Sequence, residues 1–570
     1  IMTTTPPLHG LDAFALPIRQ AVCAAIDMDL ALISLERPRQ EELGEFALPC
    51  FRFAKQAQMA PPALAAKLAD ALSIENVSCE AVGPFLNFKI DANALAQTII
   101  TSAQSSTYAG GDEGLTTLVE FSSPNIAKPM HVGHMRTTVI GAALSRIFTH
   151  LGHDVKRINH LGDWGSQFGK LVAAWQRWGS EEALSATPIA HLLELYVRYH
   201  QEEKDDETLA ADAKQSFQEL ESGEENQTRA TWRKFTEISL VEFNRVYARF
   251  GIEFDYLRGE SWYEGQLDDM ITWLDECGVT ELSDGATIVN LEEQGIKTPS
   301  LVKTAHGTTL YATRDLAAAK SRWEEFAFDQ SLYVVGAEQT LHFQQLKAVL
   351  SRCGVEWEQR MEHIPFGLIR LTEGKLSTRE GRVIALGDVL DRSVELAAKS
   401  IEEKNPELPN KELVAEQIGL GAIVFHDLKH QRQKDVVFDW KEVLSFEGDT
   451  GPYLQYTHTR CCSILRRAEK DVPSINDIDF SILEGGRELW VAIGRLPQAV
   501  REAAIKREPM LIANALLKIA AAGNGFYRDN QVLGTGDDDL EKARLVAIDT
   551  LRKTLALGMR LLGVPTPHEM

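Results

Sequence analysis

The 570-residue sequence lacks the patterns that indicate a disulfide framework, a zinc site or a membrane-spanning helix. Its seven cysteines include no Cys-x-x-Cys pair, which predicts reduced, mostly buried thiols rather than a disulfide framework or a zinc site. No apolar run reaches the roughly 18 residues that a membrane-spanning helix requires, and no basic segment followed by an apolar one stands at the start. We therefore expect a cytoplasmic protein without a membrane partner.

Positive charge is scarce as well, because 59 Lys and Arg stand against 82 Asp and Glu, which gives a formal net charge of −23. Such a chain repels polyanions at long range, and this argues against non-specific binding to DNA or RNA. Any RNA partner must therefore be bound by local basic patches. The 44% hydrophobic and 25% charged residues are typical of a globular chain, with a length sufficient for roughly three or four domains.

Hydrophobic patterns divide the chain into three main parts. Residues 1–110 combine a helical pattern at 11–28 with an alternating segment at 83–88, which predicts a small α+β domain ending in a linker at 102–114. Residues 111–390 predict a doubly wound, Rossmann-like α/β domain that binds a nucleotide. Its expected elements are strands at 117–121, 155–158, 332–335 and 364–369, a helix at 135–151, and a charged helical insertion at about 190–290.

After residue 390 the pattern predicts helices alone. A helical connector at 391–445 leads into an all-α domain at 446–570. The predicted helices cover residues 393–403, 411–428, 454–469, 489–501, 510–527 and 538–562.

The sharpest local pattern is His-Val-Gly-His, from His131 to His134, between the first strand and the first helix of the α/β domain. Gly133 allows a flat ligand to approach the backbone, and the N-terminus of a helix favours anions. The pattern therefore predicts a nucleoside triphosphate site. The alternatives are a His-x-x-His metal pair, which has no nearby third and fourth ligands, and ordinary polar caps on a helix.

The whole stretch resembles the His-Ile-Gly-His signature of class I aminoacyl-tRNA synthetases, and residues 119–141 are similar to the arginyl-tRNA synthetases in particular. The resemblance continues, in the order of the family, at residues 159–169, 311–317 and 444–453. It implies ATP-dependent ligation of L-arginine to tRNA(Arg) through an arginyl-adenylate. ATP and Mg²⁺ bound to ATP or pyrophosphate are implied, without a metal held by the protein, and nothing in the sequence suggests an obligate dimer.

A guanidinium group needs planar acceptors that bind it in a bidentate manner, and Glu120 and Asp315 are suitable carboxylates. The resemblance implies that Tyr311 helps them to hold the guanidinium, while Asn125 and Gln339 hold the backbone groups of the amino acid. The remaining residues of the predicted arginine site are Ser122 and His160. Without the family, Tyr311 would be a core aromatic residue and Asp315 a charge at a helix start.

The second nucleotide signature of the family, Lys-Met-Ser-Lys-Ser, is expected at residues 374–381, where Thr378 replaces the second lysine. Another cation must then stabilise the triphosphate, and Lys128, Lys375 and Arg379 are the candidates. A solvated turn is the alternative for this segment. Together with the histidines, Lys128 and Lys375 form the predicted catalytic set, and the predicted ATP contacts are Pro129, Gly133, Gly336, Glu338, His342, Ser377 and Arg379.

The C-terminal helices resemble an anticodon-binding domain, and residues 1–110 resemble a domain that grips the outer corner of tRNA. The predicted tRNA contacts are Tyr453, Arg460, Tyr527 and Met570. Surface arginines beside core tyrosines are the alternative. Two other functions remain open from sequence: a nucleotidyl- or adenylyltransferase that acts on a small molecule, and an inactive paralogue that binds RNA.

Overall fold

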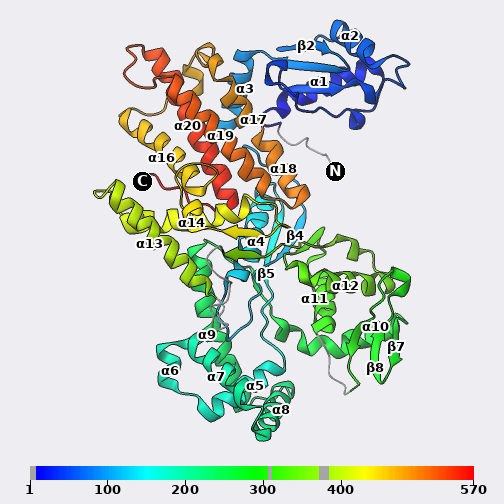
Figure 1. The fold of residues 1–570 in the computed structure, drawn as a ribbon. Coiled ribbons are helices and arrows are strands. Elements are labelled where there is room, and N and C mark those ends of the chain that lie inside the picture. The colour runs from blue at the N-terminus through cyan, green and yellow to red at the C-terminus, as the bar shows by residue number, and fades with distance from the viewer. Residues whose placement is uncertain (1–7, 306–310, 372–383) are drawn as a thin grey trace. The chain divides into compact units, whose positions relative to one another are not determined.

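The computed structural model describes residues 8–305, 311–371 and 384–570 (Figure 1). The chain folds into two compact units. One consists of Ile1–Asp112, Ile401–Ile418 and Ser445–Met570, and the other of Glu113–Ser400 and Gly419–Leu444. Among the described residues, no helix combines the length and the apolar character needed to cross a bilayer.

The second unit is built on a five-stranded parallel sheet with the strand order β11-β10-β4-β5-β6. Its strands are β4 (Thr116–Glu120), β5 (Asp154–Asn159), β6 (Tyr256–Leu257), β10 (Gln330–Tyr333) and β11 (Met361–His363). The chain adds β5 on one side of β4 and β10 on the other. This reversal opens a crevice at the carboxyl ends of β4 and β10, where doubly wound sheets bind ligands. The predicted Rossmann-like class is confirmed.

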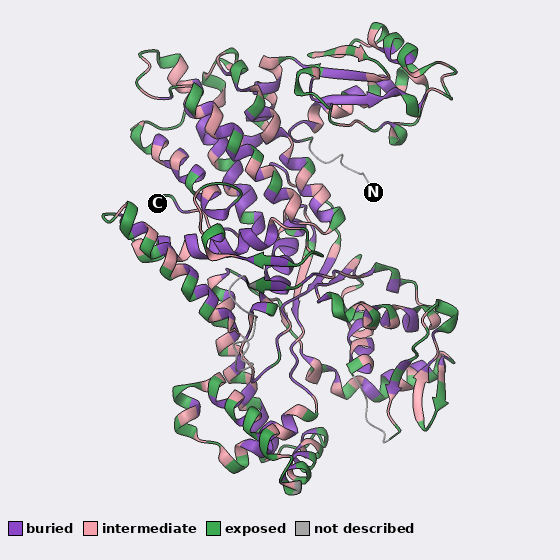
Figure 2. Cartoon of the chain, in the orientation of Figure 1, coloured by how far each residue is buried: buried purple, intermediate pink, exposed green. Residues whose placement is uncertain are grey.

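Helices connect these strands, and a helical insertion follows β5. The helices are α4 (Val132–His150), α5 (Ser166–Trp178), α6 (Glu181–Ala186), α7 (Pro188–Glu202), α8 (Glu207–Glu221), α9 (Gln227–Arg249), α10 (Leu267–Glu276), α11 (Tyr311–Phe326) and α12 (Thr340–Arg352). Helix α4 starts before residue 135, where the sequence predicted it, because His131 caps it. Apolar residues of the sheet, of α10, α11 and α12 form one buried cluster (Figure 2).

Several predicted elements need correction. Residues 364–368 are not a strand, because β11 ends at His363 and β12 (Ile369–Leu371) pairs with a different strand, β13 (Val436–Phe438). The sequence predicted no strand after residue 390, so β13 was missed. The insertion is not all helical either: β7 (Thr280–Ser283) and β8 (Ala286–Val289) form an antiparallel sheet with β9 (Ser300–Lys303).

The first unit joins a small α+β domain to a helical bundle. Its antiparallel sheet has the order β1-β3-β2. The elements of the α+β part are α1 (Asp12–Ile26), β1 (Phe46–Pro49), α2 (Pro61–Ala71), β2 (Val77–Val82), β3 (Phe85–Ile90) and α3 (Ala92–Gln104). The expected linker at 102–114 begins inside α3, and its Tyr108 is buried and donates a hydrogen bond to the Ile493 carbonyl (2.6 Å).

The C-terminal helices follow the predicted order. They are α13 (Leu386–Lys404), α14 (Lys411–Leu428), α15 (Trp440–Val443), α16 (Gly451–Arg467), α17 (Arg487–Gly494), α18 (Leu496–Lys506), α19 (Met510–Asp529) and α20 (Asp538–Leu562). The single helix predicted at 489–501 is two helices, because the chain breaks at Arg495 and restarts with Pro497 near the N-terminus of α18. The all-α character of this domain is confirmed, with β13 lying before it.

Candidate active site

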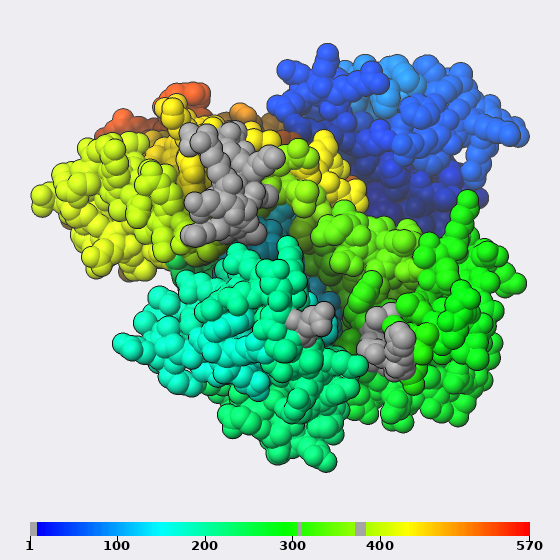
Figure 3. Space-filling model, turned by 60° about the horizontal axis from the view of Figure 1, so that its bottom comes forward, coloured from blue at the N-terminus to red at the C-terminus, as the bar shows by residue number. Residues whose placement is uncertain are grey.

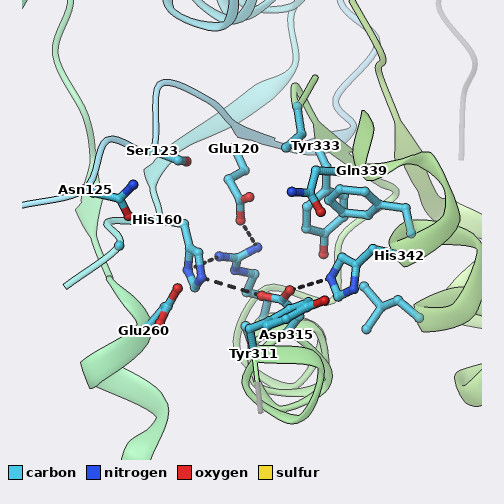
Figure 4. A pocket seen from close by; sticks show the side chains of 16 residues that line it. Glu120, Ser123, Asn125, His160, Glu260, Tyr311, Asp315, Tyr333, Gln339 and His342 are labelled. Atoms are coloured by element: carbon cyan, nitrogen blue, oxygen red, sulfur yellow. Dashed lines mark hydrogen bonds and ion pairs between the residues drawn. The ribbon is translucent and has the colours of Figure 1, made fainter. Parts of the chain in front are cut away.

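A cavity of about 390 Å³ lies in the second unit, at the carboxyl ends of its parallel strands (Figure 4). This volume is in the range of small-molecule sites. On the face shown in Figure 3, the surface of this unit is hollowed between the insertion helices α5 to α9 and the segment that carries α10 to α12. The cavity brings together seven residues that the sequence predicted: Glu120, Asn125, His160, Tyr311, Asp315, Gln339 and His342.

The carboxylate of Glu120 is held by a buried arginine. Glu120 ends β4 and is paired in register with Tyr333, which ends β10. Its Oε2 lies 2.6 Å from Nη1 of Arg322, and the two side chains are 10% and 1% exposed. The Arg322 guanidinium also lies over the Tyr333 ring, 5.7 Å from its centroid. Burial opposes the charge of Arg322, but the surrounding phenol groups and Glu120 keep its pKa well above the ordinary value.

The second carboxylate, Asp315, lies between two histidines in Figure 4. His342 Nε2 is 2.6 Å from one carboxylate oxygen, and His160 Nε2 is 3.6 Å from the other. Burial would raise the pKa of Asp315, but the hydrogen bond with His342 and the positive charges of His160 and Arg322 outweigh it and leave the pKa below the usual value. Asp315 is therefore a carboxylate at neutral pH.

Three titratable side chains that line the cavity were not predicted from the sequence: Arg322, Tyr333 and Glu260. Arg322 follows Asp315 by two turns of α11, so a search for residues on the same face of that helix would have found it. Glu260 comes from a short turn after β6, and no pattern in the sequence signals it. Burial raises the pKa of Glu260 to about 8, a shift to which Asp315 adds and which Arg314 opposes. The cavity thus holds one carboxylic acid that is largely protonated at neutral pH beside two carboxylates.

The two histidines of the sequence motif cap α4 side by side. The backbone N–H of Gly133 donates to Nδ1 of His131 (3.0 Å), and the backbone N–H of His131 donates to Nδ1 of His134 (3.1 Å). Burial lowers the pKa of both rings, that of His134 to about 3. Both rings are therefore neutral, and because Nδ1 accepts in each, the proton is on Nε2. Each ring presents an N–H donor without carrying a positive charge.

Gly133 is required by this arrangement, because a Cβ atom there would lie 2.7 Å from Cε1 of His131. Lys128 precedes the histidines, and its Nζ lies over the ring of Tyr196 at 4.6 Å from the centroid. Burial lowers the pKa of Lys128. Four predicted nucleotide contacts do not line the cavity: Pro129 and Gly133 at the start of α4, and Gly336 and Glu338 just before α12. Lys375, Ser377 and Arg379 lie outside the described residues, as does Thr378.

The structure does not bring Ser122 to the cavity wall, where its neighbour Ser123 lies instead. Its hydroxyl belongs to a buried network, 2.8 Å from the Tyr247 hydroxyl and 2.9 Å from the hydroxyl of Thr138, which donates to it. Asn159 donates to the same Tyr247 oxygen (3.1 Å). This network supports the turn after β4.

In the first unit, three of the predicted tRNA contacts lie close together. The guanidinium of Arg460 lies 5.7 Å from the centroid of the Tyr527 ring and donates to the side chain of Asn524 (3.0 Å), which in turn donates to the Tyr453 hydroxyl (3.1 Å). Met570 is apart from them, and its carbonyl oxygen accepts from Asn405 (3.3 Å).

The described part of the chain contains no group of three or more His, Cys, Asp or Glu side chains placed to hold a metal ion. The carboxylates of the cavity are suited to a cationic organic group, and the neutral N–H donors at the start of α4 are suited to an anion.

Comparisons with known proteins agree with this chemistry. Three family models match the chain: "tRNA synthetases class I (R), catalytic domain" over residues 96–440, "DALR anticodon binding domain" over residues 454–570, and "Arginyl tRNA synthetase N terminal domain" over residues 13–90. The chain is 42% identical to the arginine–tRNA ligase of Clostridium perfringens over 554 residues, which cover 96% of this chain and 98% of that one. It is 43% identical over 561 residues to that of Ligilactobacillus salivarius, covering 97% of this chain and 98% of the relative.

Solved structures show the same similarity. Thermus thermophilus arginyl-tRNA synthetase superposes with a TM-score of 0.83 at 26% identity, over 98% of this chain and 100% of that one. The Plasmodium falciparum arginyl-tRNA synthetase shares the fold, with a TM-score of 0.81 at 22% identity over 99% and 100% of the two chains.

The Arg322–Glu120 pair generates a stability prediction. Arg322→Met leaves a buried carboxylate without its charged partner, so we expect the free energy of unfolding to fall by about 3–5 kcal/mol in urea denaturation. Adding Glu120→Gln should recover part of that loss, since the buried charge is then gone. Arg233→Met is the control: it breaks an ion pair with Glu225 whose side chains are 48% and 71% exposed, and it should change the free energy of unfolding little. Equal losses for the two arginines would contradict a stabilising role of the buried pair.

Proposed function

Because the chain belongs to the arginyl-tRNA synthetase family of class I, we infer that it is an arginine–tRNA ligase, which activates L-arginine with ATP and transfers the arginyl group to tRNA(Arg). The observation that carries this inference is the cavity at the carboxyl ends of β4 and β10, which is lined by the two acidic side chains Glu120 and Asp315 that a guanidinium group can bind. A carboxylate in such a cavity favours a cationic ligand over an uncharged one, because only the cation gives it a charge-assisted hydrogen bond.

We assign the guanidinium of the substrate to Asp315 and Tyr311, with Glu120 as a shared partner. Arg322 uses Oε2 of Glu120, which leaves Oε1 for the substrate. Asp315 is an ionised carboxylate that contacts His160 and His342. The guanidinium group of arginine would replace one of these two contacts. Asn125 and Gln339, which lie on opposite sides of the cavity in Figure 4, are suited to the carboxylate and ammonium groups of the amino acid.

The adenylation step fits the donors at the start of α4. ATP, bound with Mg²⁺ as its counter-ion, places its phosphates there, and the arginine carboxylate attacks the α-phosphorus while pyrophosphate leaves. The Nε2–H groups of His131 and His134 would donate to the phosphate oxygens as negative charge develops, which needs no protein nucleophile. The nucleotide contacts predicted at Pro129, Gly133, Gly336, Glu338 and His342 remain part of this proposal.

In the second step, a terminal ribose hydroxyl of tRNA attacks the activated carbonyl and AMP leaves. We propose that residues 1–110 hold the outer corner of tRNA and that the helices after residue 446 hold the anticodon, with Arg460 beside Tyr453 and Tyr527 as a stacking and charge site and Met570 at the edge. As an enzyme of translation, the protein would act in the cytoplasm.

The experiment for this function measures charging of tRNA(Arg) by the wild-type enzyme and by Asp315→Asn. The wild type should charge tRNA with arginine and not with lysine. The variant loses a charged partner worth about 2–4 kcal/mol, so its KM for arginine should rise by roughly 30-fold or more while the KM for ATP changes little. Because the pKa of Asp315 is depressed, arginine binding by the wild type should hold at neutral pH and weaken only as the carboxylate takes up a proton in the acidic range. An unchanged KM for arginine in the variant would refute the assignment.

Lys128 is our candidate for the cation that Thr378 fails to supply. Lys128→Ala should lower the rate of adenylate formation, measured by pyrophosphate exchange with saturating tRNA and ATP, by roughly 10²-fold, because one donor to developing charge is lost. Thr378→Lys in that background should restore part of the rate. Tyr196→Leu, which removes only the ring beneath the ammonium group, should cost much less. If Lys128→Ala exchanges pyrophosphate at the wild-type rate, Lys128 is not the cation, and Lys375 or Arg379 must stabilise the triphosphate.

A further inference from the structure

Helix α4 carries a buried arginine directly behind its histidine pair. Arg136 follows His134 by two positions, and its side chain is 1% exposed. Its Nε lies 2.8 Å from Oδ1 of Asp427, whose side chain is also 1% exposed. Its Nη1 donates to two backbone carbonyls, those of Gly367 and Lys434, each at 2.8 Å. One guanidinium therefore contacts three separate segments of the chain.

Two of these contacts lie at the start of paired strands. Gly367 precedes β12, and Lys434 precedes β13, the strand that pairs in parallel with β12. The two segments approach so closely that a Cβ atom on Gly367 would lie 2.7 Å from the Lys434 carbonyl oxygen. Because both carbonyls bind the same nitrogen of Arg136, the position of β12 relative to α4 depends on this side chain.

After residue 383 the chain contacts the turn that carries His131 and His134. The backbone N–H of Leu386 donates to the Met130 carbonyl (2.8 Å), and that of Val132 donates to the Ile384 carbonyl (3.3 Å). The histidine turn is thus bound directly to the start of α13 and, through Arg136, to the start of β12. Arg136 supplies the second connection from a position where it does not line the cavity.

We propose that Arg136 is a positioning residue for adenylate formation, which holds the histidine turn and strand β12 at a fixed separation through the Gly367 and Lys434 carbonyls. The expected effect on the rate of adenylate formation rests on the proposed function. Errors of about 1 Å in the placement of catalytic groups cost roughly 10²-fold in rate, so a side chain that sets such a separation affects the rate without touching the substrate.

The test compares two arginines of the same helix. Arg136→Lys keeps a positive charge for Asp427 but cannot reproduce the guanidinium contacts to both carbonyls. Arg146→Lys is the matched control, because Arg146 also donates to two carbonyls, those of Phe250 and Gly251 (3.2 and 3.1 Å), farther along α4. Asp427→Asn removes the charged partner and leaves the carbonyl contacts in place.

For Arg136→Lys we expect pyrophosphate exchange with saturating tRNA to slow by roughly 10-fold or more, with the KM for arginine within about twofold of the wild type. Hydrogen exchange at residues 366–371 and 434–438 should become faster in the same variant. Arg146→Lys should change neither, and Asp427→Asn should lower the thermal midpoint with a smaller loss of rate.

Three results would overturn the inference. One is a rate for Arg136→Lys equal to that of Arg146→Lys. Another is unchanged hydrogen exchange at residues 366–371, which decides the matter even if activity is absent. The third is a loss of rate that simply follows the thermal midpoint across Arg136→Lys and Asp427→Asn. A wild-type enzyme that fails to charge tRNA in the same assay refutes the proposed function instead.

Discussion

The buried ion pair between Arg322 and Glu120 is the interaction on which the cavity depends. A carboxylate at the end of β4 is costly to bury alone, and Arg322, on α11, compensates it from within the chain. The pair joins the sheet to the helix that carries Asp315. The carboxylates of Glu120 and Asp315 are therefore fixed in position relative to each other. His342 and His160 lie beside the carboxylate of Asp315 and hold it at the wall of the cavity.

Helix α4 connects this cavity to the phosphate side of the site. The Thr137 hydroxyl donates to the Val334 carbonyl at the end of β10 (2.6 Å) and accepts from the Ser122 N–H after β4 (3.0 Å). Its neighbour Arg136 binds the segments before β12 and β13. The turn that holds His131 and His134 is therefore tied through consecutive residues to the strands on both sides of the crevice, which explains how neutral, uncharged donors can be kept in place before any ligand binds.

The sequence predicted the elements whose hydrophobic pattern is strong and local. Strands β4, β5 and β10 and helices α14 and α20 lie where the pattern placed them, and seven predicted side chains meet in one cavity. It failed where a short element depends on a distant partner: β12 and β13 are three residues each and exist because they pair with one another. Arg322 was not predicted because a charged residue in an amphipathic helix is expected on the solvent face when its partner is unknown. Ser122 was predicted at the arginine site, yet its backbone is left-handed (φ 70°), and its hydroxyl bonds to Tyr247 instead.

The claim that paired carboxylates select a guanidinium is tested most directly by comparing L-arginine with L-citrulline, which has nearly the same shape but a neutral urea group. The measurement is kcat/KM for each amino acid in charging tRNA(Arg) by the wild-type enzyme. Because citrulline offers no positive charge to Asp315 or to the Glu120 oxygen that Arg322 does not bind, we expect discrimination of roughly 10⁴-fold or more in favour of arginine. Citrulline used within about tenfold of arginine would contradict the account, since shape rather than charge would then determine selection.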